Sequence, residues 1–376
     1  MAIEVQTQNV AGLAAGVSLF PSNGKAKKKL VRRTDRDYSQ TLRRTFQFVF
    51  LAWNVYLGVL FYLWVRHYET GLQTPAVSRP PGVEGWLPIA GLMNLKYWLV
   101  TGHVPAIHPA AMFLLIAFLS IAFLFRKAFC SWLCPVGTIS EYLWRLGRQL
   151  FRCNFAIPRW LDIPLRGLKY FLLGFFVWAV SAMSADSIAA FMRSPYGIIA
   201  DVKMLNFFRH IGQTGLVVLG ILVVASVFVQ NFWCRYLCPY GALMGLTSFF
   251  SPTRIRRDSS ACIDCAKCAK ACPSRLPVDQ LVSVKSAECT GCMECVAVCP
   301  AQGALRMELP KIISNRRHLP AWAIAAGIAA LLFGVVGYAR TAGHWHTQLP
   351  RSVYLQLIPS ADQASHPMPD DSTIDR

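Results

Sequence analysis

Long apolar runs separated by polar segments dominate the pattern of this chain. A helix needs about 20 apolar residues to cross a bilayer, and five runs reach or approach that length. They lie at residues 46–65, 109–126, 168–191, 215–233 and 319–339. A weaker stretch at 85–100 is interrupted by Pro88 and Gly91, so we expect an interfacial or re-entrant segment there, with a sixth span as the alternative. The pattern predicts an all-α polytopic membrane protein with about five transmembrane helices.

Lysine and arginine are distributed unevenly between these runs. Nine lie before the first run, eight from Arg126 to Lys169, and twelve between the fourth and fifth runs, whereas the three other segments hold three each. Basic residues collect on the cytoplasmic side of a membrane, which predicts an inner-membrane protein with its N-terminus inside and its C-terminus outside. We expect residues 1–44 to be a disordered basic cytoplasmic tail and residues 340–376 to be an extended periplasmic tail.

Composition favours the same interpretation. Hydrophobic residues make up 54% of the chain and charged residues 15%, against about 25% charged in soluble domains. The net charge of +19 would also suit nucleic-acid binding. However, the positive charge is spread over three predicted cytoplasmic segments and no nucleic-acid-binding motif is present. The predicted partner is therefore the lipid bilayer and not nucleic acid.

Eight of the 13 cysteines form a doubled motif near the C-terminal end. Each half has the spacing Cys-x2-Cys-x2-Cys-x3-Cys-Pro of bacterial two-cluster ferredoxins, in which the fourth cysteine ligates the other cluster. The first [4Fe–4S] cluster is predicted on Cys262, Cys265, Cys268 and Cys299. The second is predicted on Cys289, Cys292, Cys295 and Cys272. Zinc sites and disulfides are the alternatives, but zinc does not need eight thiolates and disulfides are disfavoured in the cytoplasm.

The segment around these cysteines is predicted to be a small α+β ferredoxin-like domain inserted between membrane helices. About 55 residues have too small a core to fold by burial alone, so bound metal would supply the missing free energy. We expect a four-helix membrane domain at 45–254, the ferredoxin domain at 255–310 and the fifth transmembrane helix at 319–339.

A second cysteine pattern occurs twice. Residues 129–137 (FCSWLCPVG) and 233–241 (WCRYLCPYG) share an aromatic residue, Cys, Leu, Cys, Pro and Gly at matching positions, which indicates an internal duplication. Cysteines four residues apart lie on one face of a helix, so the two pairs could converge. Three interpretations stay open: a third metal site, redox-active or docking thiols, and packing cysteines. The residues concerned are Cys130, Cys134, Cys234 and Cys238.

Taken together, these motifs resemble the NapH/NosR/CcoG group of membrane polyferredoxins, over about residues 45–310. The resemblance implies electron transfer between the quinone pool or a cytoplasmic donor and a respiratory or denitrification-type redox protein in the membrane or periplasm.

Histidines are absent from all five apolar runs, and no c-type haem motif is present, so no haem is expected. Most histidines fall on the predicted outer side. His344 and His346 form their densest pair, for which a metal site is a further alternative to a simple interfacial position. The chain shows no catalytic constellation, and any enzyme activity would come from its redox centres.

Three functions compete at this point. The first is an electron conduit that links the clusters to a membrane partner or to the quinone pool. The second is an accessory or maturation factor that reduces a metal or a thiol for a respiratory enzyme, such as a terminal oxidase or a denitrification reductase. The third is a redox-sensing membrane regulator.

Overall fold

The computed structural model describes residues 31–34, 37–152, 154–309 and 318–367. Helices account for most of these residues. The elements in chain order are α1 (Ser39–Glu69), η1 (Pro81–Trp86), α2 (Pro88–Thr101), α3 (Pro109–Phe125), α4 (Ala128–Trp132), α5 (Pro135–Phe151), α6 (Arg159–Ala182), α7 (Ala185–Arg193), α8 (Pro195–Ile198), α9 (Ala200–Arg209), α10 (Gln213–Phe228), η2 (Trp233–Leu237), α11 (Pro239–Phe249), β1 (Arg254–Arg257), α12 (Lys267–Ala271), α13 (Glu294–Ala297), β2 (Leu305–Glu308), α14 (Ala321–Thr341), α15 (Arg351–Leu357) and η3 (Ala361–Gln363).

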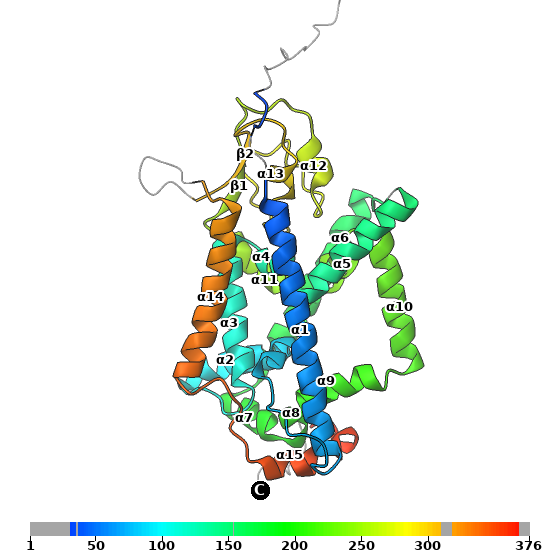
Figure 1. Ribbon diagram of the computed structural model, residues 1–376, viewed down its shortest axis with the longest axis vertical. Coiled ribbons are helices and arrows are strands. Elements are labelled where there is room, and N and C mark those ends of the chain that lie inside the picture. The colour runs from blue at the N-terminus through cyan, green and yellow to red at the C-terminus, as the bar shows by residue number, and fades with distance from the viewer. Residues whose placement is uncertain (1–30, 35–36, 153, 310–317, 368–376) are drawn as a thin grey trace, which may run out of the picture.

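The elongated molecule has its cysteine-rich segment at one end (Figure 1). Helices α1, α3 and α14 run from that end toward α7, α8 and α15 at the other. Among the described residues, α1, α6 and α14 are long and apolar enough to cross a membrane, and α9 with α10, which meet at a bend of 83°, form a fourth candidate. The chain is a mostly helical membrane protein, as predicted.

Helix α3 is the central helix of the membrane part. It spans 17 residues, and its buried positions lie all around its circumference, as expected for a helix inside a bundle. It packs against α2, α11 and α14. At about 1.5 Å per residue it is shorter than a bilayer core, yet its neighbours cover it, so it meets little lipid. Two polar clusters, described below, lie at its two ends.

The third apolar run, predicted at 168–191, begins and ends earlier in the structure. Helix α6 spans Arg159–Ala182, and a break follows at Met183. Ser184 then adopts an extended backbone and its hydroxyl accepts the amide of Ser187, which starts α7. The polar start of α6 is stable because Arg235 and Tyr236 hydrogen-bond Asp162. These partners are 73 and 74 residues away in sequence, so the local pattern could not reveal the true start.

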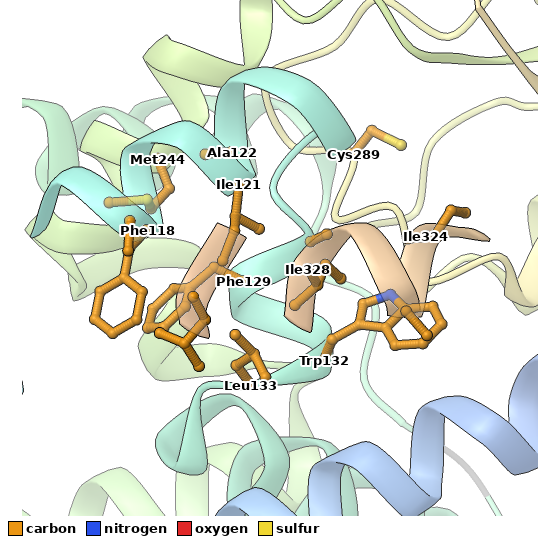
Figure 2. Packing of buried hydrophobic residues seen from close by; sticks show 14 of the residues in the cluster. Phe118, Ile121, Ala122, Phe129, Trp132, Leu133, Met244, Cys289, Ile324 and Ile328 are labelled. Carbon is orange, nitrogen blue, oxygen red and sulfur yellow. The ribbon is translucent and has the colours of Figure 1, made fainter. Parts of the chain in front are cut away.

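The cysteine-rich segment closes on a two-stranded antiparallel sheet. Strand β1 pairs with β2 so that Arg254 faces Glu308 and Arg257 faces Leu305. One continuous hydrophobic cluster joins this segment to the membrane helices: Cys289 lies with Trp132 of α4, Phe118 of α3 and Ile324 of α14 (Figure 2). The predicted ferredoxin segment therefore does not stand apart from the helices, because both parts share a core.

The segment after α14 is not extended, contrary to the prediction for residues 340–376. Helix α15 buries Tyr354 against Trp64 and Tyr68 of α1, with ring centroids 5.1 and 5.9 Å apart. Ile358 is buried beside them. A second hydrophobic cluster, to which residues between Leu349 and Ala364 contribute, thus fixes the C-terminal segment to the end of α1. Residues 368–376 lie outside the described part.

The predicted disordered tail also differs. Residues 1–30 lie outside the described residues, but Arg32 forms a β-bridge with Ala301 and the amide of Arg33 donates to Pro300 O at 3.0 Å. Helix α1 begins at Ser39, and it continues to Glu69, so its last turn includes His67. The Nδ1 atom of His67 lies 2.6 Å from Thr74 O.

A buried ionic cluster fastens the end of the molecule near α15. The Arg79 guanidinium contacts Glu84 at 2.7 Å and Asp201 at 2.6 Å. His108, fully buried before α3, places Nδ1 3.3 Å from Glu84 and Nε2 3.0 Å from Gly197 O. Burial opposes ionisation of Glu84, but Arg79 and His108 outweigh it and lower the pKa of Glu84 to about 2. Likewise, hydrogen bonding to Glu84 overcomes burial and raises the pKa of His108.

This cluster predicts a pH dependence of stability. His108 contributes fully to the free energy of unfolding below its ordinary pKa of 6.5, and this contribution is lost as the pH rises through its raised pKa. Glu84 contributes fully to the free energy of unfolding above its ordinary pKa of 4.5, and this contribution is lost only as the pH falls toward 2. The gap in unfolding temperature between the wild type and His108→Gln is therefore expected to narrow above pH 6.5. Thermal unfolding in detergent from pH 5.5 to 8.5 measures this, and a gap that stays constant would contradict it.

Candidate metal centres

The two cysteine loops of the doubled motif share an unusual backbone. In the first, Asp264 and Ala266 flank Cys265 with φ of 55° each. In the second, Gly291 and Met293 flank Cys292 with φ of 62° and 58°. Left-handed conformation is uncommon outside glycine, so its recurrence at matching positions reflects a shared fold. Each loop then enters a short helix, α12 or α13, through its second left-handed residue.

Two cavities lie within these loops. One has a volume of about 10 Å³, and the other about 20 Å³. Cys262, Cys265, Cys268 and Cys299 line the first. Cys272, Cys289, Cys292 and Cys295 line the second. Each set takes three cysteines from one motif and the fourth from the other. Four converging thiols form the donor set that an iron–sulfur cluster requires, so the residues present fit such a group.

Burial keeps several of these thiols protonated in the absence of metal. It raises the pKa of Cys268 to about 11 and of Cys292 to about 12. Metal ligation requires thiolates, so binding would release protons. Among the described residues, no three His, Cys, Asp or Glu side chains are grouped as a site for a single metal ion. Neither the pair His344 and His346 nor the cysteines therefore form a site for a single metal ion among the described residues.

The duplicated motifs place their cysteines at equivalent positions. Cys130 lies in α4, and Cys134 precedes Pro135 at the start of α5. Cys234 lies in η2, a π-helix, and Cys238 precedes Pro239 at the start of α11, where its sulfur accepts the amide of Gly241 at 3.2 Å. We call these four residues the cysteine quartet.

The members of the quartet influence one another. Burial raises the pKa of Cys134 to about 12, and the neighbouring Cys130 and Cys238 contribute to the rise. Burial raises the pKa of Cys130 to about 11, while Lys127 opposes that rise. Burial, and then Cys238, Cys134 and Cys130, raise the pKa of the Cys234 thiol well above its usual value. Both halves of the duplication therefore face one shared region.

Direct hydrogen bonds connect the quartet to the ferredoxin-like segment. Ser131 and Trp132, which follow Cys130, donate to the carbonyls of Thr290 and Gly291, at 2.7 and 3.3 Å. Those two residues lie between Cys289 and Cys292 in sequence. A further cavity of about 50 Å³ is lined by residues of both systems, including Cys130, Cys234 and Cys292.

Buried charges surround this junction, and the sequence did not single them out. Arg43 of α1 holds Glu141 of α5 through two contacts of 2.7 Å and reaches Glu294 at 3.1 Å. Lys127 and Lys169 both contact Glu288. The one signal that could have revealed Lys169 is its position at the edge of an apolar run, where a charged residue needs a partner.

Two family profiles match the chain at these sites. The "4Fe-4S binding domain" profile matches twice, at residues 107–154 and 211–257, and each match contains one cysteine pair of the quartet. The "4Fe-4S dicluster domain" profile matches residues 254–300, which contain all eight cysteines of the doubled motif. The fold and the sites thus define a membrane-bound iron–sulfur protein.

The chain belongs to the NapH/NosR-type family of 4Fe–4S membrane ferredoxins, as the resemblance implied. It is 52% identical over 328 residues to "Putative electron transport protein YccM" of Escherichia coli, covering 87% of this chain and 92% of that protein. "Ferredoxin-type protein NapH" of E. coli is 28% identical, over 62% of this chain and 74% of NapH. "Regulatory protein NosR" of Pseudomonas aeruginosa is 29% identical, over 39% of this chain and 20% of NosR. No solved structure matches significantly. The chain is therefore an iron–sulfur electron-transfer protein.

The two copies of the duplicated motif predict different responses to one substitution. A Cβ atom on Gly137 would lie 2.2 Å from the backbone oxygen of Cys130, whereas on Gly241 its nearest neighbours are 3.5 Å away. Gly137→Ala is expected to destabilise the protein by about 1–3 kcal/mol, and Gly241→Ala by less than about 0.5 kcal/mol. Unfolding of both variants in detergent measures this, and equal losses would contradict the asymmetry.

Proposed function

We propose that this chain carries electrons between two cytoplasmic [4Fe–4S] clusters and a membrane or periplasmic respiratory partner, or the quinone pool. Cys262, Cys265, Cys268 and Cys299 would hold the first cluster. Cys272, Cys289, Cys292 and Cys295 would hold the second. Each cluster, when bound, supplies a one-electron carrier. The cavities lined by these two sets, and the recurring left-handed backbone around Cys265 and Cys292, support the assignment.

The single observation that carries the proposal is the contact between helix α4, which carries Cys130 of the quartet, and the loop between Cys289 and Cys292. Ser131 and Trp132 of α4 donate to the carbonyls of Thr290 and Gly291 in that loop. In addition, the Gln40 side chain donates to Cys292 O at 2.9 Å. These bonds fix the loop of the second set of cysteines against the membrane helices. Electrons would thus leave the ferredoxin-like segment from this second set toward the quartet.

The proposed orientation places the cysteine-rich segment in the cytoplasm and the α15 end in the periplasm. The basic residues before α1, between α3 and α6, and between α10 and α14 support it. The opposite positions of the cysteine-rich segment and α15 in the molecule agree with that arrangement (Figure 1). Membership of the NapH/NosR-type family favours the respiratory or denitrification-type redox partner that the resemblance implied.

Crossed ligation is testable in a background with one cluster. Replacing Cys289, Cys292 and Cys295 by Ala leaves the first motif, whose cluster then needs a fourth ligand. Adding Cys299→Ser is expected to abolish or convert the EPR signal of that ferredoxin cluster and to lower the iron content by up to about four per protein, whereas adding Cys272→Ser leaves both unchanged. The reverse result would establish uncrossed ligation. The reciprocal background, with Cys262, Cys265 and Cys268 replaced, exchanges the two roles and serves as control.

Electron transfer itself is testable in liposomes. Dithionite-reduced protein is expected to be reoxidised by a membrane-soluble quinone analogue, as followed by the loss of the reduced-cluster EPR signal. The Cys130→Ser/Cys234→Ser variant is expected to lose most of this rate while it retains both ferredoxin signals, because the quartet lies between those clusters and the bilayer. An unchanged rate in the variant would exclude the quartet from the path. Reoxidation by a copper(II) complex alone, with none by the quinone, would favour the maturation function.

A further inference from the structure

Two buried lysines share one carboxylate beside the cysteine quartet. Lys169 of α6, whose side chain has no exposed area, places Nζ 2.6 and 2.7 Å from the two oxygens of Glu288. Lys127, 5% exposed, lies 3.8 Å from the same carboxylate. The Tyr170 hydroxyl completes the group with a 3.2 Å bond to Glu288. The two lysines and the single carboxylate together carry a net positive charge.

Other carboxylates do not balance this charge in the part of the chain that the structure describes around the quartet. Glu141 and Glu294 are engaged by Arg43 and Arg145. Asp162 is likewise shared by Arg166 and Arg235, so that second group is also positive. A buried charge without a counter-charge is costly, which makes an excess of cations here informative.

The excess charge faces the quartet. Lys127, Arg235 and Glu288 line the same cavity as Cys130 and Cys234. Burial opposes the charged form of Lys127, yet attraction to Glu288, and then to Cys130 and Cys238 among others, raises its pKa. The cavity therefore places the cations of Lys127 and Arg235 beside the thiols of Cys130 and Cys234, two members of the quartet.

We propose that Lys127 and Lys169, held in place by Glu288, are positioning residues that supply the counter-charge for an iron–sulfur cluster on the cysteine quartet. The inference rests on the proposed electron-transfer function and deepens it. Four thiolates around such a cluster carry a net negative charge, which matches the cations lining the cavity. A fixed positive charge near a cluster stabilises its reduced form, because the added electron is attracted to it, and so raises its reduction potential.

The test uses the full-length protein in detergent, with iron and acid-labile sulfide analysis and an EPR redox titration. Wild type is expected to hold about twelve irons, falling to about eight in Cys130→Ser/Cys234→Ser, and the signal lost in that variant marks the quartet cluster. Lys127→Met and Lys169→Met are expected to shift the midpoint potential of that signal downward, or to abolish it, and to leave the other two signals unchanged. Lys127→Arg keeps the positive charge, so it is expected to keep the quartet signal and its midpoint potential close to those of the wild type.

Lys285→Met is the matched control, because Lys285 is also near the second cluster loop in sequence but is exposed. It removes the same charge and is expected to leave the quartet signal in place. An unshifted quartet signal in both buried-lysine variants would overturn the counter-charge role. A wild type with about eight irons and no signal sensitive to Cys130 and Cys234 would overturn the inference as a whole. In that case two intact ferredoxin signals would leave the proposed function standing, whereas their absence would remove that function too.

Discussion

The hydrogen bonds from Ser131 and Trp132 to the carbonyls of Thr290 and Gly291 connect the two cysteine systems of this protein. Both carbonyls belong to a loop that bends through left-handed residues, so few of its polar groups can pair within the loop itself. Donors from the membrane part satisfy them and seal the junction. The hydrophobic cluster beneath, which includes Phe118 and Ile324, packs the helices and the ferredoxin-like segment together in one continuous core (Figure 2).

The duplication explains why the quartet exists, and the differences between its halves show how it was adapted. Both copies place a cysteine before a proline that starts a helix, α5 or α11. The first copy is α-helical before that point and the second is a π-helix. Only the first copy packs its glycine tightly against the preceding turn. Short π-helical segments are frequent at functional sites, and here the π-helix also carries Arg235, which holds Asp162 of α6. The first copy is therefore closely packed at Gly137, whereas the second copy connects the quartet to helix α6 through Arg235.

The sequence was sufficient for features that repeat or that have a fixed period. The doubled cysteine motif led to the family, and the paired Cys-x3-Cys-Pro motifs led to the duplication that one profile matches twice. Apolar runs located the helices, because burial in a bundle or in lipid requires such runs. Features that depend on distant partners were missed. The start of α6 depends on Asp162 meeting Arg235, and α15 depends on Tyr354 meeting Trp64. Neither contact produces a periodic pattern in the sequence. The same is true of the contacts that Lys127 and Lys169 make with Glu288.

Helix α3 shows how those distant partners organise the membrane part. Its apolar length is too short for a bilayer-facing span, yet each end carries buried charge: Arg79, Glu84 and His108 before it, Lys127 with Glu288 after it. Charges at such depth are tolerated where protein covers them and where they pair. Helices α2, α11 and α14 supply that cover. The short helix therefore holds one polar cluster at each of its ends and fixes the distance between them. The cluster beside the quartet is the one with a positive charge left unbalanced by the described side chains around it.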